Sequence, residues 1–179
     1  MKLLITGVPG IGKTTLALKL YGILTKEFNL KVDGFITEEI RERGIRKGFV
    51  IKSLDGKVEA ILAHVNIKSP YRVSKYGVNV DAIDEVCVPI LEQAMLNADV
   101  VIIDEIGKME LLSKKFQNAV KKVFDSDKVV IATIGKFRHP FRDSIVRRKD
   151  VMIIELTYNN RNYIVNPILE SIRKWLLKK

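Results

Sequence analysis

Short apolar runs alternate with amphipathic stretches along this chain, and the alternation predicts buried strands separated by helices. The apolar runs occupy residues 2–6, 35–40, 100–104, 129–133 and 151–156. Between them, apolar residues recur at the spacing of one helix face: Leu16, Leu20, Ile23 and Leu24 in the first helix, and Leu112, Phe116, Val120, Val123 and Phe124 in a later one. We therefore expect an α/β fold in which residues 100–104, 129–133 and 151–156 are core strands.

The segment after residue 43 interrupts this alternation. Residues 48–51 and 58–62 flank Asp55-Gly56, a dipeptide that favours a tight turn between antiparallel strands. We expect a hairpin here, inserted into the sheet. Residues 68–80 show no periodicity and are expected to form a loop that exposes Tyr71 and Tyr76.

Two prolines mark helix boundaries. Pro89 lies in a helical segment that ends near residue 97 and indicates either a kink or the first turn of a second helix. Asn166-Pro167 predicts an N-cap followed by proline at the first helical position. The buried face of that last helix would carry Ile168, Ile172, Trp175 and Leu176. No internal repeat or Gly/Ser linker is present, so one domain over residues 1–179 is expected.

Composition narrows the function classes. With 47% hydrophobic and 29% charged residues the chain resembles an ordinary globular protein. No apolar run approaches the roughly twenty residues that span a bilayer, so we expect no membrane association. Cys87 is the only cysteine, which excludes an intrachain disulfide and favours a cytoplasmic location. We also expect a monomer.

The net charge of +10 leaves nucleic-acid binding possible. It is not favoured, because the basic residues are scattered and no basic motif interleaved with aromatic residues is present. A nucleoside triphosphate is a polyanion that the same field would attract.

Residues 7–14 match the phosphate-binding loop pattern G-x-x-x-x-G-K-[ST]. Glycines let the backbone fold around an anion, and the N–H groups of the loop and of the following helix point at phosphate. Lys13 would reach the β- and γ-phosphates as a catalytic residue, and the Thr14 hydroxyl would take one Mg²⁺ coordination position. The predicted nucleotide-binding residues of this loop are Gly7, Val8, Pro9, Gly10, Ile11, Gly12, Lys13, Thr14 and Thr15.

A second motif ends the apolar run at residues 100–104. An aspartate at the carboxyl end of a buried strand lies beside the phosphate loop in a doubly wound sheet, so Asp104 is predicted to be the second Mg²⁺ ligand. The adjacent Glu105 is predicted to be the catalytic base that polarises a water against the γ-phosphorus. The predicted nucleotide-binding residues of this motif are Val101, Ile102, Ile103, Asp104, Glu105 and Ile106.

Three further groups have two interpretations each. Arg142 is predicted to be an arginine delivered in cis to the γ-phosphate, although the cations around it also fit a solvated helix face. Thr133 either senses the γ-phosphate or caps the turn before Gly135. Residues 158–161 either contact the base or form an asparagine turn.

The spacing Asp104-x-x-Gly107 also fits the switch motif of regulatory GTPases. Those proteins require an Asn-Lys-x-Asp segment after the fourth strand, where this chain has residues 133–136, TIGK. Guanine specificity is therefore not expected.

The chain resembles the small, thermostable nucleoside-triphosphatases whose animal member is known as cancer-related nucleoside-triphosphatase. The resemblance rests on residues 7–15 (GVPGIGKTT), 34–41 (GFITEEIR), 46–49 (RKGF) and 104–111 (DEIGKMEL), and residues 76–78 (YGV) look like a further signature. It implies Mg²⁺-dependent hydrolysis of ATP, GTP and other nucleoside triphosphates with relaxed base choice. Glutamate next to the magnesium aspartate is similar to recombinase-like phosphate-loop NTPases, which implies a three-layer fold with a mainly parallel central sheet of order 5-1-4-3-2.

Two other functions remain open. A nucleotide or small-molecule kinase would use the same loop to transfer the γ-phosphoryl group, with residues 71–77 as the acceptor site. An ATPase stimulated by nucleic acid or a partner would explain the positive charge.

Overall fold

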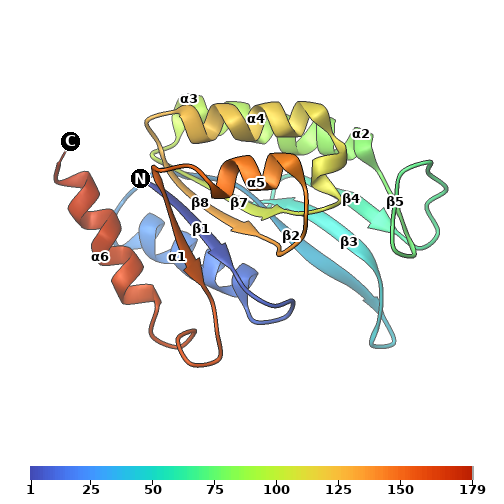
Figure 1. Cartoon of the computed structure of the whole chain (residues 1–179), viewed down its shortest axis with the longest axis horizontal. Helices are drawn as coiled ribbons and strands as arrows, with labels where there is room; N and C mark the ends of the chain where they lie inside the picture. The colour runs from blue at the N-terminus through green and yellow to red at the C-terminus, as the bar shows by residue number, and fades with distance from the viewer. Residues whose placement is uncertain (179) are drawn as a thin grey trace.

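One mixed sheet organises the fold of the computed structural model, which describes residues 1–178 (Figure 1). Over these residues the sheet has nine strands in the order β5-β6-β4-β3-β2-β7-β8-β1-β9. Their bounds are β1 Lys2–Thr6, β2 Val32–Glu42, β3 Ile45–Ser53, β4 Glu59–His64, β5 Arg72–Val73, β6 Tyr76–Val78, β7 Val100–Ile106, β8 Val129–Ile134 and β9 Val151–Glu155.

The expected mainly parallel sheet of order 5-1-4-3-2 describes one half of this sheet and not the whole, with β1, β2, β7, β8 and β9 as the five predicted strands. Strands β2, β7, β8, β1 and β9 pair in parallel and follow one another as β9-β1-β8-β7-β2. The pairs β2–β3, β3–β4, β4–β6 and β5–β6 are antiparallel. The predicted β3–β4 hairpin is confirmed, but it belongs to an antiparallel half that continues through β6 to β5.

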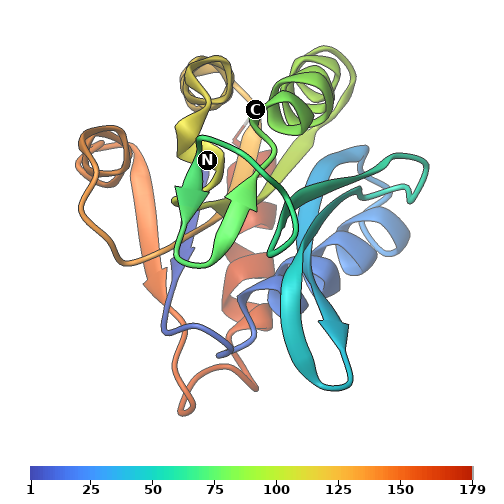
Figure 2. The ribbon, with the colours of Figure 1, turned by 90° about the vertical axis from the view of Figure 1, so that its right-hand side faces the viewer.

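Helices cover both faces of the sheet. Their bounds are α1 Lys13–Lys26, α2 Val80–Ala82, the π-helical turn η1 Ile83–Cys87, α3 Val88–Asn97, the 3₁₀ turn η2 Glu110–Leu112, α4 Lys114–Asp125, α5 Pro140–Val146 and α6 Val165–Leu176. Helices α1 and α6 lie on one face, and α3, α4 and α5 lie on the other (Figures 1 and 2). Within residues 1–178, no helix is both long and apolar enough to cross a membrane.

Strand β1 shows how the alternation of side chains builds two cores. Leu3 and Ile5 pack with α1 and α6, whereas Leu4 packs with the residues of α3 and α4 on the opposite face. All three side chains are fully buried. Because β1 is covered on both faces, its packing fixes the position at which the following phosphate-loop segment starts.

Strand β9 corrects the expectation of a fifth core strand. Within residues 1–178 it forms the edge of the sheet and pairs only with β1. Met152 and Ile153 are 42% and 45% exposed. An apolar run identifies a strand but not the number of its neighbours, which depends on the strand order.

Residues 68–80 also differ from the expected loop. They contain β5 and β6, and α2 begins at Val80 with Asn79 as its N-cap. Tyr71 is exposed as expected, but Tyr76 is buried against the ring of Phe49, with the ring centroids 5.2 Å apart. Strands of two and three residues are too short to show a periodicity.

The helix ends are also refined. Pro89 lies in the first turn of α3, directly after the π-helical turn. Leu112 precedes α4 and belongs to η2. Asn166 is not the N-cap of α6, because that helix begins at Val165 and is entered through a turn in which the Ile164 N–H donates to Asn160 O at 3.0 Å.

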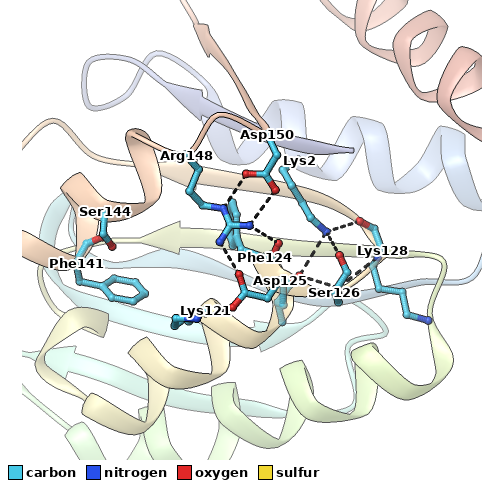
Figure 3. Close-up of polar contacts among 11 residues, drawn as sticks. Lys2, Lys121, Phe124, Asp125, Ser126, Lys128, Phe141, Ser144, Arg148 and Asp150 are labelled. Carbon is cyan, nitrogen blue, oxygen red and sulfur yellow. Dashed lines mark hydrogen bonds and ion pairs between the residues drawn. The ribbon is translucent and has the colours of Figure 1, made fainter.

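A group of ion pairs at the amino end of the parallel strands anchors α4 (Figure 3). Arg148 donates to both carboxylate oxygens of Asp150 at 2.9 Å, to Asp125 Oδ1 at 2.6 Å and to Phe124 O at 3.0 Å. The Lys2 ammonium donates to the carbonyl oxygens of Ser126 at 2.8 Å and Lys128 at 2.6 Å. We call Lys2, Asp125, Arg148 and Asp150 the amino-end clamp.

Candidate functional site

A cavity of about 670 Å³ lies at the carboxyl end of the parallel strands. The segment between β1 and α1 lines one side, and the β2–β3 hairpin, which extends past the ends of the neighbouring strands (Figure 1), lines the other. The lining residues are Gly7, Val8, Pro9, Gly10, Gly12, Lys13, Thr14, Thr15, Thr37, Glu38, Glu39, Arg46, Phe49, Asp104, Glu105, Gly135 and Lys136. Both sequence motifs therefore meet in one place, where a switch-point ligand binds in open α/β sheets.

The loop adopts a conformation that requires glycine at two positions. Gly12 has φ 111° and caps α1 without a side-chain hydrogen bond, so the first N–H groups of the helix remain available for an anion. At Gly7, a Cβ atom would lie 2.7 Å from Leu156 O, so only glycine lets the loop pass this close to the end of β9. The Lys13 ammonium donates to Gly7 O at 3.2 Å and Val8 O at 3.3 Å, which places its charge over the loop.

Asp104 is the centre of a hydrogen-bond network. It is 2% exposed, and its Oδ2 accepts from Thr14 Oγ1 at 2.7 Å while Oδ1 accepts from Thr133 Oγ1 at 2.6 Å. Thr37 donates its hydroxyl to Asp104 O at 2.8 Å. Burial raises the pKa of the Asp104 carboxyl, and the hydrogen bonds from Thr133 and Thr14 offset part of that rise. The Thr133 side chain is fully buried, and its hydroxyl orients the Asp104 carboxylate.

The donor set fits a hard divalent cation. The Thr14 hydroxyl and an Asp104 carboxylate oxygen lie side by side at the cavity, and Mg²⁺ prefers such oxygen ligands. Within the described residues, no group of three or more His, Cys, Asp or Glu side chains could hold a metal ion alone. The arrangement is typical of sites in which Mg²⁺ is shared between one or two protein ligands and substrate phosphates.

Two further acids lie beside Asp104. Glu105 lines the cavity, and Glu110 is 2% exposed. A Cβ atom at Gly107 would meet Glu110 Oε2 at 2.5 Å and Glu105 Oε1 at 2.9 Å, so both carboxyls crowd the same point. Burial raises the pKa of Glu105, and burial together with the Glu105 charge raises the pKa of Glu110 well above its usual value.

Some predicted residues support the site without lining the cavity. Ile11, Val101, Ile102, Ile103 and Ile106 are buried in the core. Arg142 is outside the lining: its Nε donates to Gly135 O at 2.8 Å and its Nη1 lies 3.2 Å from Asp143 Oδ1. The role of Arg142 at the γ-phosphate stays a prediction.

A second cavity of about 450 Å³ lies on the other side of the loop. Its lining includes Gly10, Gly12, Thr15 and Lys19 from the loop and α1, and Arg161 from the segment after β9. The Arg161 guanidinium lies 4.9 Å from the centroid of the Tyr158 ring. Asn160 forms the expected turn, because its amide donates to Glu155 O and accepts from the Thr157 N–H, both at 2.8 Å.

The cavity residues of the hairpin and Lys136 were not predicted from the sequence motifs. Thr37, Glu38 and Glu39 follow the apolar start of the strand predicted over residues 35–40, and polar residues after such a start are a signal that could have been used. No local sequence pattern indicates that Arg46 and Phe49 line the cavity, because their position there depends on the register of β3 against β2. Lys136 pairs with Glu155 at the rim.

Comparison with known proteins gives a consistent result. The family model described as NTPase matches residues 2–169. Nucleoside-triphosphatase THEP1 of Thermotoga maritima is 51% identical over 173 residues, covering 97% of this chain and 96% of that protein. The crystal structure of THEP1 from Aquifex aeolicus has a TM-score of 0.86 and 42% identity, covering 96% of this chain and 98% of that one. The solution structure of a human cancer-related nucleoside triphosphatase has a TM-score of 0.81 and 34% identity, covering 97% of each chain.

Proposed function

The chain belongs to the NTPase family whose model spans residues 2–169, and from this premise we propose that it hydrolyses ATP, GTP and other nucleoside triphosphates to the diphosphate and phosphate with Mg²⁺. The observation that carries the proposal is the link between the two motifs. The Thr14 hydroxyl at the start of α1 is bonded to the buried Asp104, and the next residue, Glu105, lines the cavity.

Each part of the cavity has a role in this reaction. The N–H groups around Gly12 and the Lys13 ammonium bind the β- and γ-phosphates and stabilise the charge that develops on them. Mg²⁺, held by Thr14 and Asp104, would neutralise further phosphate charge when it is bound. The Thr133 hydroxyl fixes the orientation of the Asp104 carboxylate, and the Thr37 hydroxyl holds the main-chain carbonyl of Asp104.

Glu105 is proposed to orient and deprotonate the attacking water. The water oxygen forms a bond to the γ-phosphorus, the bond from that phosphorus to the β,γ-bridging oxygen breaks, and the bridging electrons leave with the diphosphate. The proton goes from water to the Glu105 carboxylate. A base positioned in this way contributes about 10²–10⁴ in rate.

The second cavity supports relaxed base choice. It continues the phosphate loop on the side of Thr15 and offers the Arg161 guanidinium, which already lies over the Tyr158 ring. A guanidinium plane binds the face of any base by stacking and cation–π attraction. Contact with the face of the base, and not with its hydrogen-bonding edge, does not distinguish one base from another.

The test is a steady-state survey of the common nucleoside triphosphates, with and without EDTA, in which the products are identified. We expect free phosphate and the diphosphate from several bases, and no product when Mg²⁺ is removed. Transfer of the γ-phosphoryl group to an added acceptor, with no free phosphate, would identify a kinase. Turnover that rises with single-stranded RNA or DNA in a salt-sensitive manner would identify a stimulated ATPase.

A further inference from the structure

We propose that Arg46, on the hairpin opposite the phosphate loop, binds the γ-phosphate of the nucleotide and acts as the catalytic arginine of this site. The inference rests on the proposed function, because it assigns a further residue to the same reaction. Sequence analysis gave this role to Arg142, which the structure places outside the cavity lining.

The position of Arg46 is the first argument. Its side chain lines the cavity that Lys13, Asp104 and Glu105 also line. It is the second residue of β3, next to the turn of the hairpin that extends past the neighbouring strands (Figure 1). A triphosphate bound by the loop therefore lies between Lys13 on one wall and Arg46 on the other.

The second argument is that two nitrogens of the Arg46 guanidinium are held by hydrogen bonds, while the third, Nη2, remains available to a ligand. Arg46 Nε donates to the Tyr76 hydroxyl at 3.0 Å, and Nη1 donates to Glu39 Oε1 at 2.9 Å. The guanidinium carbon lies 5.3 Å from the centroid of the Phe49 ring. Within residues 1–178, Nη2 has no hydrogen-bond partner. The guanidinium of arginine carries a rigid, planar set of donors that matches phosphate oxygens. Because the Arg46 guanidinium is already fixed in place, its Nη2 donors are oriented before a phosphate binds.

The neighbouring Arg41 provides a comparison, because its contacts are those of an arginine with a structural role alone. It binds the same Glu39, with Nε 2.8 Å from Oε2, and it donates Nη1 to Gly44 O at 2.8 Å. It does not line the cavity. Both arginines balance the charge of Glu39 and lower the pKa of its carboxyl, but of the two only Arg46 lines the cavity.

The chemistry that Arg46 supplies is electrostatic. As the bond to the bridging oxygen breaks, charge is redistributed over the γ-phosphoryl oxygens and the leaving oxygen. The free Nη2 donors would bind a γ-phosphoryl oxygen and stabilise that charge, while Glu39 and Tyr76 keep the guanidinium from swinging away. No proton or covalent bond is exchanged. Tyr76 and Glu39 are positioning residues in this arrangement.

The experiment compares Arg46→Gln with Arg41→Gln as the matched control, since both variants remove one cation and one partner of Glu39. We expect Arg46→Gln to lower kcat about a thousandfold, the effect of removing a catalytic arginine, and Arg41→Gln to leave kcat unchanged. Arg46→Lys should stay slow, because an ammonium lacks this planar set of donors. Added guanidinium at non-denaturing concentration should partly restore Arg46→Ala.

A second measurement separates this inference from the proposed function. Calorimetry compares a non-hydrolysable triphosphate with the diphosphate, and we expect the Arg46→Gln variant to lose the preference of the wild-type protein for the triphosphate. If the wild-type protein hydrolyses no triphosphate, the proposed function fails, and this binding difference still decides whether Arg46 contacts the γ-phosphate. Equal kcat for the two variants, or an unchanged triphosphate preference, would overturn the assignment.

Discussion

Two charged clusters lie at opposite ends of the same parallel strands and are built on different principles. In the amino-end clamp, Arg148 pairs with Asp125 at 2.6 Å and with Asp150 at 2.9 Å (Figure 3). At the carboxyl end lie Lys13, Asp104, Glu105 and Glu110, which we call the carboxyl-end cluster. Within residues 1–178, none of its three acids forms an ion pair with a protein cation.

The pKa shifts of the two clusters have opposite signs. Hydrogen bonds from Lys121 and Arg148 lower the pKa of Asp125, and Arg148 lowers the pKa of Asp150. Burial raises the pKa values of Asp104, Glu105 and Glu110. The clamp pairs its acids with Arg148, whereas in the carboxyl-end cluster the Lys13 charge offsets only part of the rise in the pKa of Asp104 and Glu105. Such groups weaken the fold and are typical of sites that act on a ligand.

The largest expected effect that separates the clusters comes from Lys13→Ala. Among the residues that the structure describes, Lys13 donates only to two loop carbonyls, so its loss should leave the thermal unfolding midpoint nearly unchanged. Turnover should fall by about 10²–10³, as when one donor to a developing charge is removed. Phosphate release and thermal unfolding measure the two quantities. A variant that unfolds early but turns over normally would place Lys13 in the structure and not in the reaction.

Arg148→Ala should give the reverse result. Its removal leaves Asp125, Asp150 and Phe124 O without their shared donor, and we expect the free energy of unfolding to fall by about 2 kcal/mol. The kcat should not change, because the clamp lies at the opposite end of the strands. Arg147→Ala is the matched control for the loss of an adjacent cation. A loss of activity at unchanged stability would show that the two ends are coupled.

The smallest effect concerns the dependence of stability on pH. The folded pKa of Glu110 is above the unfolded one, so the folded state holds the proton more tightly. Its contribution is complete below about pH 4.5, the usual glutamate value, and is lost as the pH rises toward the folded pKa. The groups facing Glu110 are Glu105, Asp104 and the Cys87 thiol, whose own pKa is raised by burial and by Glu110.

We therefore expect the unfolding midpoint of Glu110→Gln to rise relative to wild type as the pH increases from 5 to 8. The glutamine amide of the variant cannot ionise. The variant therefore does not lose stability with rising pH in the way that the wild-type protein does. The acids of the clamp have lowered pKa values, so their contribution is complete above about pH 3.8, the usual aspartate value, and is lost as the pH falls from there through the lower folded values. Thermal unfolding of the two proteins, in a series extended down to about pH 3, measures the effect of Glu110 and the loss from the clamp acids. A constant difference between the two proteins would mean that Glu110 is ionised in the folded state.

More of the carboxyl-end cluster than of the rest of the molecule could be predicted from the sequence. The phosphate loop and Asp104 follow from local patterns, because a glycine loop before a helix and an acid at the end of a buried strand have meaning at those positions alone. Their meeting at one cavity follows from the parallel strand arrangement. The Thr14–Asp104 hydrogen bond at 2.7 Å is the direct consequence.

Features set by distant partners could not be predicted. Tyr76 is buried because β6 brings it to Phe49, and Arg46 reaches the cavity because of the hairpin register. The exposure of β9 depends on its place at the sheet edge. None of these facts is visible in the local pattern of residues, since each depends on which strands become neighbours.

The central claim is that Glu105 activates water at a site that binds the nucleotide without its help. The direct test is Glu105→Gln, measured for Mg²⁺–ATP affinity by calorimetry and for turnover by phosphate release. Glu38→Gln is the control, because Glu38 lines the same cavity but is paired with Lys52 at 2.6 Å. The account predicts unchanged affinity with turnover at least about a hundredfold lower for Glu105→Gln, and normal turnover for the control. Unchanged turnover of Glu105→Gln would contradict it.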